Sequence, residues 1–206
     1  MKNVSTAVKF LEDAFEALNN RFFANELEKP MITIQSTPKV YGHFTTYDAW
    51  ALQDGSEHIG RKEINIGAET LDRPIANIIA TLVHEMVHYW CLLNGVQDTS
   101  RGGTYHNKKF KNAAEEHAIL IEYDKRIGWS VTQPSETLIA FVHDQGWNGI
   151  NFSRNGGVAE AKPKKKSSTR KYTCPICGQS VRATKTVNII CGDCMCAMEA
   201  EEDDED

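Results

Sequence analysis

The sequence lacks a long uninterrupted apolar run. No stretch of its 206 residues approaches the ~20 apolar residues that a membrane-spanning helix needs. The N-terminal residues lead into a charged amphipathic segment and not into the apolar core of a signal peptide. Hydrophobic residues make up 41% and charged residues 25% of the chain, a balance typical of soluble globular proteins. We therefore expect a folded cytoplasmic protein without a membrane partner.

Cysteine is scarce outside one short segment. Cys91 stands alone, and the other five of the six cysteines lie between positions 174 and 196. In a reducing compartment, clustered Cys-x-x-Cys pairs indicate metal ligands and not disulfides. Two such pairs, separated by 13 residues, predict four thiolates around one structural Zn²⁺. The four predicted ligands are Cys174, Cys177, Cys191 and Cys194, with Cys196 as a spare.

Charge is distributed in blocks along the chain. Residues 162–198 carry eight Lys or Arg against one acidic residue, whereas residues 199–206 carry seven acidic residues and no basic one. Such a division indicates separate modules, one of them suited to a polyanion. We predict a main domain over 1–152, a basic flexible linker over 153–171, a zinc ribbon over 172–198 and an acidic disordered tail over 199–206.

Apolar spacing and breaker residues predict the elements of the main domain. Helical spacing covers residues 5–28, with Ser5 as the N-cap, and a second helix begins near Asp72 and Pro74 and ends at Gly95. Residues 129–152 show no clear pattern. Further elements are predicted as strands over 31–36, 40–52 and 62–67 and a helix over 107–123.

The most informative motif is His84-Glu85-Met86-Val87-His88. Two histidines four residues apart share one face of a helix, so both imidazoles can reach a single Zn²⁺. Glu85 lies beside them, where it can act as a general base toward a water molecule. The motif therefore predicts a catalytic metal site on the second helix, with both histidines as ligands.

A catalytic zinc site usually has three protein ligands, so a further ligand is expected elsewhere in the chain. Positions three and six after His88 are Cys91 and Asn94, which excludes the metzincin pattern. No cysteine precedes Cys91, which excludes an upstream thiolate ligand of the deformylase type. We favour His106, which follows a glycine-rich loop. The carboxylates of Glu115 or Glu116 are the alternative.

Three segments of the main domain form a recognisable set: Lys62-Glu-Ile-Asn-Ile-Gly, Thr81-Leu-Val-His-Glu-Met-Val-His-Tyr-Trp and Tyr105-His106-Asn-Lys-Lys-Phe110. Together they resemble the SprT-like zinc metalloproteases, the Spartan-related family. Asn107 stands where the family usually has glycine. The resemblance implies His106 as the third ligand and an α+β fold, with a zincin-like core of helices packed on a small sheet. It also implies a C-terminal zinc ribbon.

The resemblance further implies a zinc-dependent endopeptidase that acts on DNA-bound or DNA-crosslinked proteins. Glu85 would be its general base, and Tyr105 or Tyr89 would either stabilise the oxyanion or merely pack. Two alternatives stay open: a non-catalytic DNA-binding or adaptor protein with structural zinc only, and a metallopeptidase with a DNA-independent substrate. A fourth protein ligand at the histidine site would favour the adaptor.

The basic block is the predicted contact surface for DNA. Clustered lysines and arginines suit a phosphate backbone, although such a run is also typical of a solvated linker. If the protein binds DNA, we expect it at the nucleoid or in the nucleus. The predicted DNA-binding residues are Lys164, Lys165, Lys166, Arg170, Lys171, Arg182 and Lys185.

Overall fold

The chain divides into two units, Met1–Gly156 and Gly157–Asp206, in the computed structural model. None of the helices in the described part of the chain is long and apolar enough to cross a bilayer. The first unit mixes helices with small sheets, which confirms the predicted α+β class. The structure describes all residues except 38, 55–56, 156–169 and 201–206.

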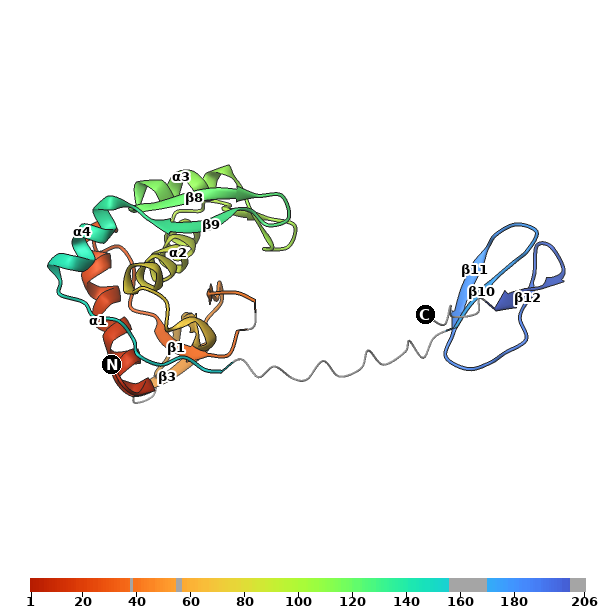
Figure 1. Ribbon diagram of the computed structural model, residues 1–206, viewed down its shortest axis with the longest axis horizontal. Helices are drawn as coiled ribbons and strands as arrows, with labels where there is room; N and C mark the ends of the chain where they lie inside the picture. Colours follow the sequence, from red (N-terminus) through yellow and green to blue (C-terminus); the bar gives the residue numbers. More distant parts are fainter. Residues whose placement is uncertain (38, 55–56, 156–169, 201–206) are drawn as a thin grey trace. The chain divides into compact units, whose positions relative to one another are not determined.

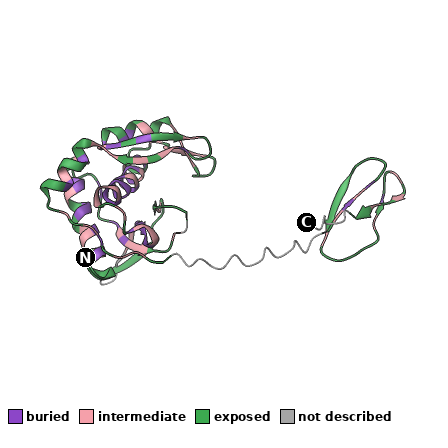
Figure 2. Ribbon diagram, in the orientation of Figure 1, coloured by how far each residue is buried: buried purple, intermediate pink, exposed green. Residues whose placement is uncertain are grey.

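Helix α2 (Ile75–Leu93) lies between the other layers of the first unit (Figure 1). It contacts α1 (Val4–Phe22) and α4 (Glu136–Asp144), as well as strands of two different sheets. Eleven of its 19 residues are buried, and its ribbon is coloured mainly as buried in Figure 2. Because α2 is packed on several sides, side chains that project from it are held in fixed positions.

Glycine ends α2 as the sequence predicts. Gly95 adopts φ +64°, a left-handed conformation that glycine reaches without a steric penalty. The amide of Val96 donates to Cys91 O at 2.8 Å and the amide of Gly95 donates to Leu92 O at 3.3 Å. This pair of bonds is a Schellman motif, which satisfies carbonyls that the helix end would otherwise leave unpaired.

Two small sheets flank α2. The first sheet consists, in spatial order, of β1 (Met31–Gln35), β5 (Glu63–Gly67) and β2 (Gly42–Phe44). β1 is parallel and β2 antiparallel to the central β5, and every residue of β5 is buried. The second sheet consists, in spatial order, of β6 (Thr99–Ser100), β7 (Tyr105–His106), β9 (Gly128–Pro134) and β8 (Ile119–Asp124).

The helix predicted over 107–123 is wrong in its second half. Helix α3 (Lys108–Glu116) ends where Ala118 takes φ +65°, and β8 follows at once. In β8 the side chains alternate, with Ile119 and Ile121 buried and Leu120 exposed between them. An alternation with period two fits a strand packed on one face, so burial of the two isoleucines decides against helix.

The first helix also differs from its prediction. Its N-cap is Asn3 and not Ser5, because the Asn3 side chain accepts a hydrogen bond from the amide of Thr6. Helix α1 ends at Phe22, six residues before the predicted end, and Ala24 and Asn25 take positive φ values of 51° and 62°.

The region predicted as one strand over 40–52 contains two separate strands, β2 and β3 (Trp50–Asp54). Among the described residues, β3 pairs only with β4 (Glu57–Arg61), which the sequence did not predict. The short 3₁₀ helix η1 (Ala68–Thr70) follows β5. Residues 129–152, for which the sequence predicted no element, form most of β9 and all of α4.

The second unit is a set of short strands. β10 (Arg170–Thr173) pairs antiparallel with β11 (Ser180–Ala183) and with β14 (Glu199–Ala200), and β12 (Ile190–Cys191) pairs with β13 (Cys196–Ala197). Two predicted boundaries shift as a result. β10 takes the last two residues of the predicted linker, and β14 takes the first two of the predicted disordered tail, because both segments join the backbone ladder. The rest of that tail, like residues 156–169 of the linker, lies outside the described residues.

Asn19 offers a test of how the end of α1 is held. Its buried side chain donates to Leu27 O at 2.8 Å and accepts from Leu27 N at 3.2 Å. Asn19→Ala leaves both backbone groups unpaired, so we expect the free energy of unfolding to fall by about 1–3 kcal/mol. Urea unfolding followed by tryptophan fluorescence measures this, since all four tryptophans lie in the first unit.

Asn20→Ala is the matched control, because Asn20 is the exposed neighbour on the same helix. We expect its unfolding midpoint to stay close to that of the wild type. Equal losses in the two variants would show that the side-chain bonds to Leu27 do not hold the end of α1.

Candidate metal centre and cleft

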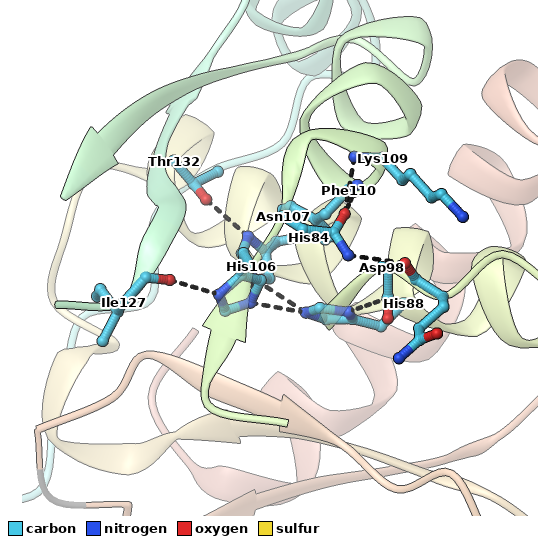
Figure 3. A network of polar contacts seen from close by, with 10 residues as sticks. His84, His88, Asp98, His106, Asn107, Lys109, Phe110, Ile127 and Thr132 are labelled. Carbon is cyan, nitrogen blue, oxygen red and sulfur yellow. Dashed lines mark hydrogen bonds and ion pairs between the residues drawn. The ribbon is translucent and has the colours of Figure 1, made fainter. Parts of the chain in front are cut away.

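Three imidazoles converge in the first unit. Helix α2 presents His84 and His88 from successive turns, and β7 presents His106 immediately before α3 (Figure 3). The Nε2 atoms lie 3.2 Å apart between His84 and His88, 3.1 Å between His88 and His106, and 3.3 Å between His84 and His106. Zn–N distances of ~2.0–2.1 Å in a tetrahedral site require N···N separations of about 3.3 Å. The triangle therefore fits a zinc ion.

The opposite nitrogen of each ring has its own partner. His88 Nδ1 donates to the Asp98 carboxylate at 2.6 Å, and His106 Nδ1 donates to Ile127 O at 3.3 Å. His84 Nδ1 lies 2.7 Å from Thr132 Oγ1, which itself donates to Ser130 O and therefore accepts from the ring. Hydrogen bonds of this kind fix the tautomer and direct the Nε2 lone pairs toward a metal.

The rings of His84 and His106 are also kept neutral. Burial, aided by the neighbouring imidazoles, lowers the pKa of His84 well below its usual value. Burial likewise lowers the pKa of His106 to about 4. Phe110 on α3 closes the site from one side, with its ring centroid 4.5–4.7 Å from those of all three imidazoles. Neutral imidazole is the form that binds metal ions, so the surroundings favour metal binding at pH 7.

Glu85 is buried beside this triangle, and its carboxyl group lines the same cleft as the three histidines. Burial raises the pKa of Glu85 to about 7. A carboxylate with a pKa near neutrality can both take up and release a proton at physiological pH, as a general base requires.

The cleft that contains Glu85 and the histidines has a volume of about 820 Å³. The edge strand β2 and residues 130–133 of β9 contribute to its lining, together with the loop that carries Asp98. Apolar residues from several elements line it as well, namely Val40, Phe44, Leu92, Val96, Ile127 and Val131. A cleft of this size can take several residues of an extended peptide.

The sequence model of the SprT-like family matches residues 11–125. This chain belongs to the SprT-like family. The matched region contains Glu85 and the three converging histidines, and membership in the family indicates a metallopeptidase-type function. Comparisons with curated proteins and with solved structures gave no match.

Of the candidates for the third metal ligand in this SprT-like chain, His106 lies with His84 and His88. Glu115 and Glu116 are exposed on α3, and Glu115 pairs with Lys111. Neither candidate tyrosine lines the cleft. Tyr105 Oη instead meets Tyr123 Oη at 3.1 Å, and the Tyr89 ring stacks on Phe44.

Sequence reasoning missed Asp98 and Thr132, because no local spacing ties either of them to the motif. It also gave no role to Asn107, the departure from the family pattern. The Asn107 side chain caps α3 by accepting from the amides of Lys109 and Phe110, and it donates to Gln97 O. Asn107 thereby fixes the segment after His106 to the loop that carries Asp98.

The second unit brings together the four predicted cysteines. The sulfurs of Cys174, Cys177, Cys191 and Cys194 all lie within 4.8 Å of one another. Zn–S distances of ~2.3 Å in a tetrahedral site give S···S separations of about 3.8 Å, so the cluster fits zinc. Hydrogen bonds from backbone amides, that of Cys177 foremost, lower the pKa of Cys174 to about 6. The spare Cys196 lies with its sulfur 3.5 Å from that of Cys174.

The two Cys-x-x-Cys turns are built alike. Gly178 donates to Cys174 O with φ +73°, and Met195 donates to Cys191 O with φ +51°. Gly192, inside the second pair, has no positive φ, and Met195 takes the left-handed position that corresponds to Gly178.

Four of the predicted DNA-binding residues are described. Lys171 on β10 lies directly opposite Arg182 on β11, and Arg170 lies opposite Ala183. Arg170, Arg182 and Lys185 are exposed. The predicted contacts Lys164, Lys165 and Lys166 lie outside the described residues.

Asp98 provides a test of the histidine site. Asp98→Asn keeps the shape of the side chain but removes the charge that supports His88, so we expect the zinc affinity of this site to fall about 10- to 100-fold. Competition with a chelator on the full chain measures this, and the cysteine site serves as an internal reference. Asp144→Asn is the control, since Asp144 is exposed on α4. Unchanged affinity in Asp98→Asn would contradict the role of the carboxylate.

Proposed function

We propose that this protein is a zinc-dependent endopeptidase that cleaves proteins bound or crosslinked to DNA. One observation carries the assignment as a peptidase: three convergent imidazoles lie beside the buried Glu85 in an 820 Å³ cleft. Among the described residues, the metal-ligand group at this position contains only these three histidines. Three protein ligands with an open position are typical of catalytic zinc, whereas structural sites have four.

The histidine ligands and the cysteine ligands suit two different kinds of zinc site, one catalytic and one structural. The three histidines would hold a catalytic Zn²⁺, and the four cysteines would hold a structural Zn²⁺ that stabilises a unit too small for an apolar core of its own. A bound zinc ion would supply Lewis-acid polarisation of the scissile carbonyl and would favour ionisation of water. Glu85 would remove the proton of the attacking water and deliver it to the leaving amine.

The cleft favours an extended peptide as substrate. β2 is an edge strand of its sheet and lines the cleft with Gly42, His43 and Phe44. An extended segment can add to such an edge through backbone hydrogen bonds, and apolar walls can accept its side chains. The arrangement suits unfolded or flexible protein segments and requires no particular fold in the substrate.

The link to DNA rests on the second unit and on the family resemblance. Arg170, Arg182 and Lys185 are exposed on a small metal-binding unit, where they can contact phosphates. Lys171 and Arg182, paired across two strands, place two positive charges side by side. A unit of this kind would hold the protease on DNA near its substrate.

The test compares the wild type with Glu85→Gln, both loaded with zinc. Each protein is incubated with a DNA-binding protein, with and without single-stranded DNA, and the fragments are followed by gel. We expect DNA-stimulated cleavage by the wild type and a loss of about 10²-fold or more in Glu85→Gln, because the variant lacks the base. Both proteins should hold two zinc ions per chain.

Each other outcome rejects part of the proposal. Cleavage that is indifferent to DNA would retain the peptidase and reject the role on DNA. Equal cleavage by both proteins would reject Glu85 as the base. No cleavage by a wild type with two bound zinc ions, across several unfolded substrates, would favour the non-catalytic adaptor.

Gly42 tests how closely β2 approaches the base. A Cβ atom at this position would lie 2.8 Å from Asn65 O and 3.0 Å from Glu85 Oε1. Gly42→Ala must therefore displace the Glu85 carboxylate or the strand, and we expect peptidase activity to fall about 10- to 100-fold while zinc is retained. Gly149→Ala is the control, because its new Cβ would meet nothing closer than 3.8 Å. Full activity in Gly42→Ala would contradict this placement of Glu85.

A further inference from the structure

We propose that Arg73 is a specificity-determining residue that binds an acidic side chain of the peptide substrate near the scissile bond. The inference rests on the proposed endopeptidase function and adds to it a preference among substrates. It follows from three features of Arg73: its place in the cleft, the rigid support of its guanidinium group and the lack, among the described residues, of a carboxylate within ion-pair distance.

Arg73 lies just before α2 and lines the same cleft as Glu85 and the three histidines. Its Nη2 donates to Thr81 Oγ1 at 3.1 Å. Thr81 precedes Glu85 by four residues on α2, a distance of about 6 Å along the helix axis. An extended peptide advances ~3.3 Å per residue. A side chain one or two residues from the scissile bond can therefore reach the guanidinium group.

The guanidinium group is held in place before any substrate arrives. Besides its bond to Thr81, Arg73 donates from Nε to Thr70 O at 2.9 Å. Its carbon Cζ lies 4.0 Å from the centroid of the Tyr41 ring, which also lines the cleft. Because the group is already ordered, binding a carboxylate would cost little additional side-chain entropy.

In the described part of the chain, no carboxylate lies within ion-pair distance of Arg73, whereas Arg61 pairs with Glu28 at 2.6 Å. Burial lowers the pKa of the Arg73 guanidinium, which nevertheless stays charged because arginine ionises far above neutrality. The adjacent Asp72 acts on the guanidinium group only at longer range, where its charge raises the pKa of Arg73. With two N–H groups engaged, the others can donate to a bidentate carboxylate.

The rest of the lining favours a peptide over a nucleic acid at this position. Lys39 lines the cleft as a second cation, but Val40, Leu92 and Val131 contribute apolar surface. A phosphate backbone needs a row of cations, whereas two cations beside apolar walls suit an acidic residue flanked by apolar ones. The cleft thus predicts cleavage next to segments of mixed acidic and apolar composition.

The experiment uses the zinc-loaded full chain and a set of fluorogenic peptides. The peptides differ only in carrying glutamate or glutamine at one of the three positions on either side of the scissile bond. We expect kcat/KM to favour glutamate about tenfold or more at one position, the value of a charge-assisted hydrogen bond. In Arg73→Gln this ratio should fall to about one, and in Arg73→Lys to an intermediate value.

Arg21→Gln is the matched control, since Arg21 also lies over an aromatic ring, that of Phe22, but is not among the residues that line the cleft. It should keep the wild-type ratio. A wild type without any preference for glutamate would overturn the proposal even if Arg73→Gln fails to fold. An equal preference in wild type and folded Arg73→Gln would overturn it as well.

A binding measurement separates this proposal from the proposed function. Fluorescence anisotropy with labelled peptides and zinc-loaded Glu85→Gln needs no catalysis, so tighter binding of the glutamate peptide supports the subsite even if the wild type cleaves nothing. Equal binding of both peptides would overturn it. If single-stranded oligonucleotides displace the glutamate peptide and Arg73→Gln weakens their binding, Arg73 contacts phosphate, which also overturns the proposal.

Discussion

The hydrogen bonds from three imidazole Nδ1 atoms are the constraint on which the rest of the site depends. Asp98, Thr132 and Ile127 come from different parts of the chain, and each takes one Nδ1 hydrogen, so that all three Nε2 atoms point to one place. Three nitrogens 3.1–3.3 Å apart, with no metal among them, would leave their lone pairs facing one another. The fold accepts this arrangement because a cation can satisfy all three at once.

The surrounding layers make this arrangement possible. α2 is packed by both sheets and by other helices, so the two histidines and Glu85 project from a rigid support into one cleft. The first sheet brings β2 against Glu85 through Gly42, and the second sheet brings His106 and Thr132 from the other side. The proposed peptide substrate would lie between the two sheets, near the guanidinium group of Arg73, which is bonded to Thr81 one helical turn before Glu85.

Local patterns predicted the parts of the site that local spacing controls. The four-residue spacing of His84 and His88 and the two Cys-x-x-Cys pairs needed only knowledge of helix and turn geometry. Asp98 and Thr132 could not be found in this way, since Thr132 lies 48 residues from His84 and meets it only through sheet packing. The strand at Ile119 was missed for a related reason: its alternating burial depends on the layer beneath it.

The central claim is that the three histidines form a metal centre with one position left open. Crystals of the zinc-loaded full chain, with anomalous diffraction recorded on both sides of the zinc edge, test it directly. The account predicts an anomalous peak about 2.0–2.1 Å from each of the three Nε2 atoms, with only solvent as a further ligand. A peak confined to the cysteine cluster, or a fourth protein side chain bound at the histidine site, would contradict it.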